Sequence, residues 1–175
     1  MVVLHWTMAA LVAVQFVLAA RMQDETRDLI SRVDLYQTHK SVGLSLAALL
    51  VLRLAFRCVG RTPFTPAAGP AWQAWLARTV HLALYLCLAV LPVSGFLMVS
   101  AAPIQIPTLV FGLLPVPHPI GPDKTIYELA RRVHEFAGAA LLWLAALHVA
   151  GASLHPFAWG DNVLSRMWFG GRAGR

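Results

Sequence analysis

Four long apolar stretches, separated by polar or proline-rich segments, dominate the pattern of this 175-residue sequence. They cover residues 2–20, 41–56, 80–101 and 136–154. Each is close to the roughly 20 residues that a helix needs to cross a bilayer core, or reaches that length with its flanks. We therefore predict an all-α fold, a transmembrane four-helix up-and-down bundle in one domain (residues 1–175), with spans at about 2–20, 39–57, 79–101 and 130–155.

Composition agrees with this pattern, because 58% of the residues are hydrophobic and only 13% are charged, against about 25% charged in soluble domains. The alternative for residues 2–20 is a cleaved signal peptide, since "VLAA" resembles a cleavage site. No basic segment precedes this stretch and its apolar run is long for a signal peptide, so a span is favoured.

The distribution of charge predicts the orientation. The first and third connections are each balanced, whereas the second carries Arg57, Arg61 and Arg78 and no acidic residue, and the tail is also basic. Basic segments stay on the cytoplasmic side, so both termini and the second connection are expected there. The net charge of +6 thus reports membrane topology, and it gives no support to nucleic-acid binding because no basic domain with interleaved aromatics is present.

Histidines are the candidate chemistry. Six of the seven lie within or at the ends of the predicted spans: His5, His39, His81, His134, His148 and His155. The seventh, His118, lies in a loop, and no role is assigned to it. An ionisable residue inside a span is a functional hypothesis by default. The alternative, interfacial histidines that bond water or a carbonyl, is reasonable for one residue and less so for six.

Spacing orders these histidines into two levels. His148 follows His134 by 14 residues, which places it within roughly 40° of the same helix face and about 21 Å further along the axis. One metal ion cannot reach both, but two separate cofactors can. At matching depth, His39 pairs with His134 at the outer side. The inner partner of His148 is either His5 or His81, and depth alone does not choose.

Paired histidines with no Cys, Asp or Glu on the same helix faces suit haem iron better than zinc. Zinc sites need three or four protein ligands, whereas haem needs two axial imidazoles and is well held in helical bundles. No C-x-x-C-H motif occurs, so the haem is expected to be non-covalent. Small residues beside the ligands leave room for the macrocycle: Gly43, Gly138, Ala139, Ala140 and Gly151. Alternatively, these small residues serve close helix packing.

Two further features accompany the histidines. Arg53 follows His39 by the same 14 residues, so it is expected near the inner cofactor, where its guanidinium suits a propionate. The alternative is an arginine that extends to the cytoplasmic interface. Residues 102–122 contain six prolines and are predicted to form an ordered cap over the outer face, with a plain spacer as the alternative.

The sequence resembles the prokaryotic cytochrome b561 proteins, four-helix di-haem membrane cytochromes, over nearly its whole length. The resemblance is carried by "LHW" in the first span, "HKSVGL" in the second, "HLALYLCLAVLPVSGFLM" in the third, and "VHEFAG" and "LHVAGASLH" in the fourth. It implies two haem b groups, with His5 rather than His81 as the inner partner of His148. The implied iron ligands are therefore His5, His39, His134 and His148.

Two departures from the family pattern stand out. Few residues precede "LHW", so either the true start lies upstream or the first ligand helix frays. The family often has "HH" where this chain has His155 followed by Pro156, which questions a role for the second histidine of that motif.

The resemblance also implies an activity in the bacterial inner membrane: oxidation of periplasmic superoxide with reduction of ubiquinone. Six-coordinate iron offers no open position, so outer-sphere electron transfer is expected. His155 and His81 are candidates to bond quinone or relay protons, because histidine exchanges protons near neutral pH; the alternative is interfacial hydrogen bonding. Competing hypotheses are a cytochrome b anchor subunit for a dehydrogenase or hydrogenase, and a haem-free transporter.

Overall fold

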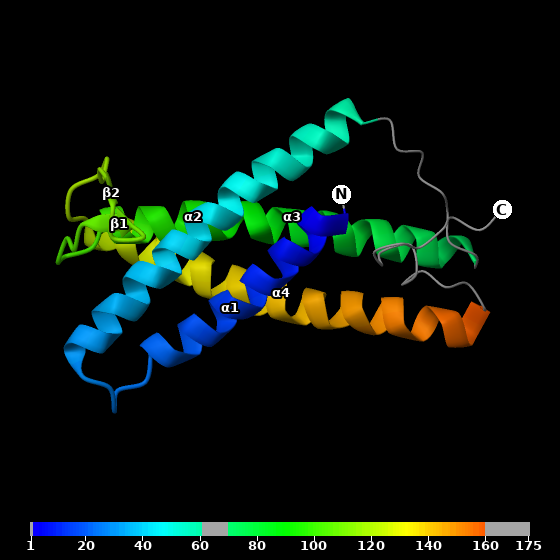
Figure 1. Cartoon of the computed structure of the whole chain (residues 1–175), viewed down its shortest axis with the longest axis horizontal. Coiled ribbons are helices and arrows are strands. Elements are labelled where there is room, and N and C mark those ends of the chain that lie inside the picture. Colours follow the sequence, from blue (N-terminus) through cyan, green and yellow to red (C-terminus); the bar gives the residue numbers. More distant parts are fainter. Residues whose placement is uncertain (1, 61–69, 160–175) are drawn as a thin grey trace.

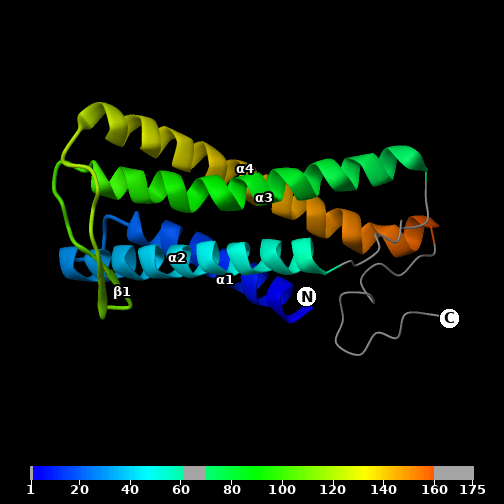
Figure 2. The same ribbon diagram turned by 90° about the horizontal axis from the view of Figure 1, so that it is seen from above.

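Four helices and one β-hairpin make up the computed structural model, which describes residues 2–60 and 70–159, with side chains up to residue 154. The helices are α1 (Val2–Met22), α2 (Leu29–Val59), α3 (Ala71–Ser100) and α4 (Lys124–Trp159). They run alternately up and down, and α1 with α2 and α3 with α4 form two antiparallel pairs (Figures 1 and 2). All four are long and apolar enough to cross a membrane, so the predicted all-α transmembrane bundle is confirmed.

Capping residues extend the helices beyond the apolar stretches. Asp28 caps α2, because its carboxylate accepts hydrogen bonds from the Ser31 backbone N–H at 2.9 Å and from the Ser31 hydroxyl at 2.6 Å. The same bonds lower the pKa of Asp28. Pro70 supplies the extended residue before α3, as proline suits a helix start. The polar turns thus fix where each helix begins.

Most of the bundle surface is apolar. The buried core is small and centres on Met8, Val42, Leu46 and Leu50, whereas large side chains such as Phe136 and Trp143 are 77% and 75% exposed. A soluble bundle would bury such rings, but lipid solvates them without cost. The exposed surface is therefore the lipid-facing surface.

The segment between α3 and α4 is ordered. It contains β1 (Thr108–Val110) and β2 (Leu114–Val116), paired antiparallel, and its turn uses positive φ at Phe111 and Gly112. Gln37 of α2 donates to the Pro107 carbonyl at 2.7 Å and accepts from the Leu109 N–H at 3.3 Å. These bonds tie the hairpin to the bundle, as an ordered cap requires.

Candidate functional site

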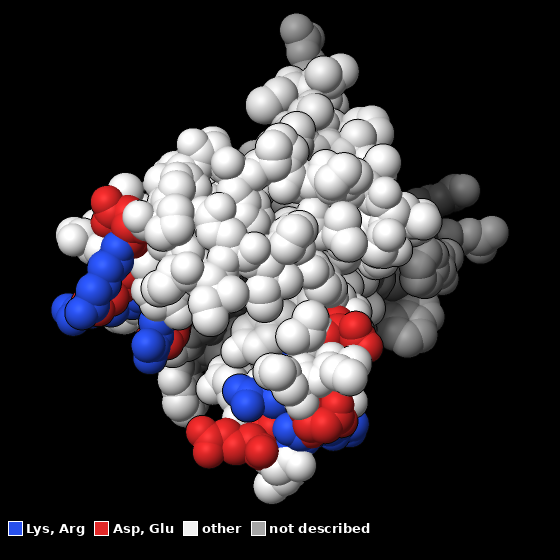
Figure 3. Space-filling model, turned by 90° about the vertical axis from the view of Figure 1, so that its left-hand side faces the viewer, with Lys and Arg blue, Asp and Glu red and all other residues white. Residues whose placement is uncertain are grey.

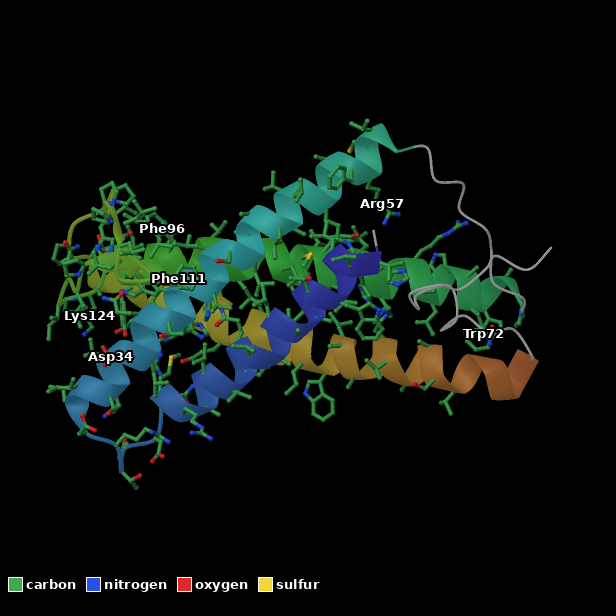
Figure 4. The ribbon with its side chains drawn as sticks, in the orientation of Figure 1. Asp34, Arg57, Trp72, Phe96, Phe111 and Lys124 are labelled. Atoms are coloured by element: carbon green, nitrogen blue, oxygen red, sulfur yellow. The ribbon has the colours of Figure 1, made fainter. Side chains whose placement is uncertain are left out.

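The two ends of the bundle can be told apart by the hairpin. We call the end that carries the hairpin and the α1–α2 turn the hairpin end, and the opposite end the far end. Phe96 and Phe111 lie at the hairpin end and Arg57 toward the far end (Figure 4). The histidines of the helices form one group toward the hairpin end and another toward the far end. The hairpin-end site contains His39 and His134, and the far-end site contains His5, His81 and His148.

In the hairpin-end site, two imidazoles from different helices lie close together in an edge-on arrangement. The ring centroids of His39 on α2 and His134 on α4 are 6.3 Å apart, with the planes inclined by 68°. His134 Nδ1 lies 3.0 Å from the Leu91 carbonyl oxygen and 3.2 Å from Ser94 Oγ, both on α3. His39 Nδ1 is buried and has no hydrogen-bond partner among the described residues. The two rings are thus held differently.

A cavity of about 580 Å³ opens beside these rings, within the range of small-molecule and cofactor pockets. All four helices contribute to its lining, for example through Val12, Gly43, Leu91 and Gly138, and Thr108 of the hairpin closes part of it. A Cβ on Gly95 would lie 3.0 Å from His134 Cε1. The glycine therefore allows the ring to approach α3 closely.

In the far-end site, three imidazoles meet instead of two. His148 of α4 lies 6.2 Å from His5 of α1 and 5.1 Å from His81 of α3, measured between ring centroids. The structure therefore places both candidate partners, His5 and His81, next to His148. Depth in the membrane had not distinguished between them. The two ring separations differ by more than 1 Å, since 6.2 minus 5.1 is 1.1.

Two arginines and a tyrosine lie next to these imidazoles. Arg53 Nε donates to Tyr85 Oη at 2.9 Å, and the guanidinium carbons of Arg53 and Arg57 lie 5.9 and 5.8 Å from the centre of the Tyr85 ring. Arg53 also interacts electrostatically with His5 and His148. The ion pairs between described residues involve other arginines and a lysine, so this cluster is positively charged.

Both histidine pairs fit haem iron. An imidazole nitrogen ligates a transition metal at about 2.0 Å and the ring centre lies about 1 Å further out, so two opposed ligands have centroids about 6 Å apart. The 6.3 Å of His39–His134 and the 6.2 Å of His5–His148 match this separation. No group of three or more His, Cys, Asp or Glu in the described part of the chain is arranged to hold a metal ion. The donor set therefore suits haem rather than zinc.

Other residues from the sequence analysis lie as follows. His118 is on the segment that follows β2, where its Nε2 lies 3.0 Å from Thr108 Oγ1 and its ring packs edge-on to Phe96. Burial, and then the charge of Lys40, lower the pKa of His118. His155 is on α4, but its side chain lies outside the described residues.

Sequence reasoning missed Gln15, Tyr85 and Ser94. Gln15 Nε2 donates to the His39 carbonyl at 3.1 Å, and Ser94 is only 4% exposed beside His134. Each is a polar residue inside an apolar span, and this position was the feature of the sequence that could have indicated a functional role. Spacing could not show that Gln15 contacts His39, Ser94 contacts His134 and Tyr85 contacts Arg53.

Comparison with known proteins agrees with this geometry. The family model described as "Prokaryotic cytochrome b561" matches residues 1–170. "Cytochrome b561 homolog 1" of Escherichia coli K12 is 25% identical over 94% of this chain and 92% of its own length. "Cytochrome b561 homolog 2" of the same organism is 30% identical over 75% of this chain and 69% of its own length. The chain therefore belongs to the prokaryotic cytochrome b561 family, whose members are membrane electron-transfer proteins with b-type haem.

Proposed function

We propose that this protein carries electrons from a donor at the hairpin end, superoxide by resemblance, to ubiquinone in the membrane, with two haem b groups as carriers. The observation that supports two haem sites is the near equality of two imidazole separations, 6.3 Å for His39–His134 and 6.2 Å for His5–His148. When bound, haem supplies reversible one-electron chemistry. The four histidines would supply the axial nitrogens.

The geometry favours His5 over His81 as the partner of His148. The His81–His148 separation of 5.1 Å is about 1 Å shorter than two opposed ligands of one metal require. His81 is also exposed at the bundle surface, where a lipid-soluble quinone can reach it. We assign His81 and His155 to quinone bonding or proton relay, and Arg53 to binding a haem propionate.

The far end has the charge that a propionate site needs. Arg53 and Arg57 both lie on Tyr85 without a carboxylate partner among the described residues. A guanidinium held by a neutral phenol keeps its remaining donors for an anion. Tyr85 thus orients Arg53, whose charge would be neutralised on cofactor binding.

The hairpin end has no comparable concentration of positive charge. Lysine and arginine side chains are intermixed with acidic ones on this face (Figure 3). Arg131 Nε lies 2.8 Å from a Glu135 carboxylate oxygen and Lys124 Nζ lies 4.0 Å from one of Glu128. A small anionic donor would arrive there with little electrostatic steering. We place both termini in the cytoplasm and the hairpin in the periplasm because the second connection is basic.

Two measurements on purified protein test this function. A reduced-minus-oxidised spectrum with a pyridine haemochrome count should give two haem b per chain; a single haem or none contradicts the proposal. Superoxide with a ubiquinone analogue should then give turnover by the protein alone. If haem is present but turnover requires a partner dehydrogenase, the anchor-subunit function replaces the superoxide activity.

A further inference from the structure

One short segment of α3, residues 91–95, lies against one edge of the His134 ring. The Leu91 carbonyl oxygen lies 3.0 Å and Ser94 Oγ 3.2 Å from His134 Nδ1. Gly95 lets the same edge of the ring approach α3 closely, since a Cβ there would lie 3.0 Å from His134 Cε1 and 3.2 Å from Nδ1. Leu91, Ser94 and Gly95 of α3 therefore all lie against a single imidazole.

These contacts determine which nitrogen carries the proton. A carbonyl oxygen can only accept, so the 3.0 Å contact with Leu91 requires an N–H at Nδ1 of the neutral ring. The Ser94 hydroxyl lies 2.7 Å from the Val90 carbonyl oxygen, which is the shortest of its contacts and uses its one proton. The Ser94 oxygen is then free to accept from Nδ1 as well. Nε2 of His134 is consequently left as the unprotonated nitrogen.

His39, the opposing ring, lacks such support. Its Nδ1 is buried without a partner, as is Oε1 of Gln15, while Gln15 Nε2 is occupied by the His39 carbonyl at 3.1 Å. Only the backbone of His39 is thus held by Gln15. The hairpin-end site has one ligand ring with two acceptors at Nδ1 and one ring with none among the described residues.

We propose that Leu91 and Ser94 are positioning residues that fix the Nδ1–H tautomer of His134, and that Ser94 lowers the reduction potential of the hairpin-end haem. The effect on the potential rests on the proposed function, because it requires a bound haem; the tautomer assignment does not. Acceptors at Nδ1 make an imidazole a stronger electron donor through its other nitrogen, and such outer hydrogen bonds tune a bound metal. Stronger donation stabilises ferric over ferrous iron. The oxidised form of this one haem is therefore favoured.

The test is a redox titration of the haem-loaded protein with two serine variants and one control. Ser94→Ala should keep both haems and move one midpoint to higher potential, while the other midpoint stays. Ser94→Thr, which keeps the hydroxyl, should restore the original value. Ser45→Ala is the matched control, because the Ser45 hydroxyl also donates to the carbonyl four residues earlier, at 3.0 Å, but forms no hydrogen bond with a histidine of the described part of the chain. Unchanged midpoints in Ser94→Ala, or equal shifts of both, overturn the proposal.

A second readout does not depend on haem. In ¹⁵N-histidine-labelled protein without haem, the His134 resonances should report a neutral ring protonated at Nδ1. Protonation at Nε2 would refute the assignment, even if Ser94→Ala fails to fold. A protein that binds no haem but shows the Nδ1–H tautomer would refute the proposed function, and with it the effect of Ser94 on a haem potential, but would leave the tautomer assignment standing. The wrong tautomer in a protein that binds two haems would refute the assignment and leave the proposed function standing.

Discussion

The hairpin-end and far-end sites differ in how the chain surrounds their histidines. At the hairpin end, two imidazoles lie beside a cavity of about 580 Å³ that all four helices and the hairpin line, with neutral hydrogen bonds at His134. At the far end, three imidazoles adjoin two arginines and Tyr85. One group of histidines thus lies beside a shaped pocket in whose lining a single positive charge, Lys40, is balanced by a single negative one, Glu135. The other group lies in a positively charged cluster.

This difference suggests a division of roles within the proposed electron path. A neutral pocket controls ligand geometry and hence reduction potential, because hydrogen bonds to the ligands are among the protein's means of tuning a haem. A positive cluster with a spare imidazole suits anionic groups and proton exchange. The predictions below separate the two sites, from the largest expected effect to the smallest.

Replacement of a histidine that we propose as an axial ligand should have the largest effect. His134→Ala should remove one of two haems, because iron at the hairpin end would lose one of its two protein nitrogens. His81→Ala should retain both haems, since His5 provides the better-spaced partner for His148. The haem-to-protein ratio measures both outcomes. Loss of a haem in His81→Ala would reverse the assignment of His5 and His81.

The second-largest effect is expected from a single added methyl group beside His134. Gly95→Ala places a Cβ 3.0 Å from His134 Cε1, and overpacking of this kind costs about 1–3 kcal/mol. We expect haem affinity at the hairpin end to fall about tenfold, with the far-end haem retained, as haem titration would measure.

Gly151→Ala is the matched control, because nothing lies within 4 Å of its added Cβ. Alanine favours a helix by about 0.8–1 kcal/mol over glycine, so this variant should be at least as stable as the original. Equal haem affinity in both glycine variants would contradict the close fit at Gly95.

Loss of the arginine should affect the far end alone. Arg53→Gln removes the charge that faces His5 and His148, and a charged hydrogen bond contributes about 1.5–3 kcal/mol. Because Arg53 is only half-buried, we expect the lower part of that range, roughly a tenfold weaker far-end haem. Arg131→Gln, at the hairpin end, serves as the control in the same haem titration. An equal effect of both variants would mean that Arg53 does not bind the cofactor.

The smallest effect concerns the hairpin and pH. The pKa of His118 is lowered by burial and by the charge of Lys40. The ring therefore resists protonation in the ordered hairpin, whereas in an opened hairpin it takes up a proton near pH 6.5. The stability that His118 contributes is present above that pH and is lost as the pH falls toward the lowered value. Hydrogen exchange of hairpin amides, corrected for intrinsic rates, should accelerate on acidification. His118→Gln should abolish this acceleration, and its persistence in that variant would exclude His118 as the cause.

Much of the architecture was predictable from sequence because hydrophobic length alone identifies membrane spans. The hairpin was harder to foresee, since "TLVFGLLPV" is short and lies in a proline-rich loop, and its order depends on Gln37 and Ser41, about 70 residues away. Likewise, α2 begins at Leu29 because of the Asp28 cap rather than because of its apolar run. Local polar chemistry, rather than hydropathy, set these details.

The sequence by itself determined the four spans, the two levels of histidines and the shared face of residues 14 apart, because helix geometry converts spacing directly into direction and depth. Only the tertiary structure placed both His5 and His81 against His148, gave them different ring separations, and brought Ser94 to His134 and Tyr85 to Arg53. Those contacts join different helices. Periodicity along one helix contains no information about which neighbour it faces or how closely the two approach.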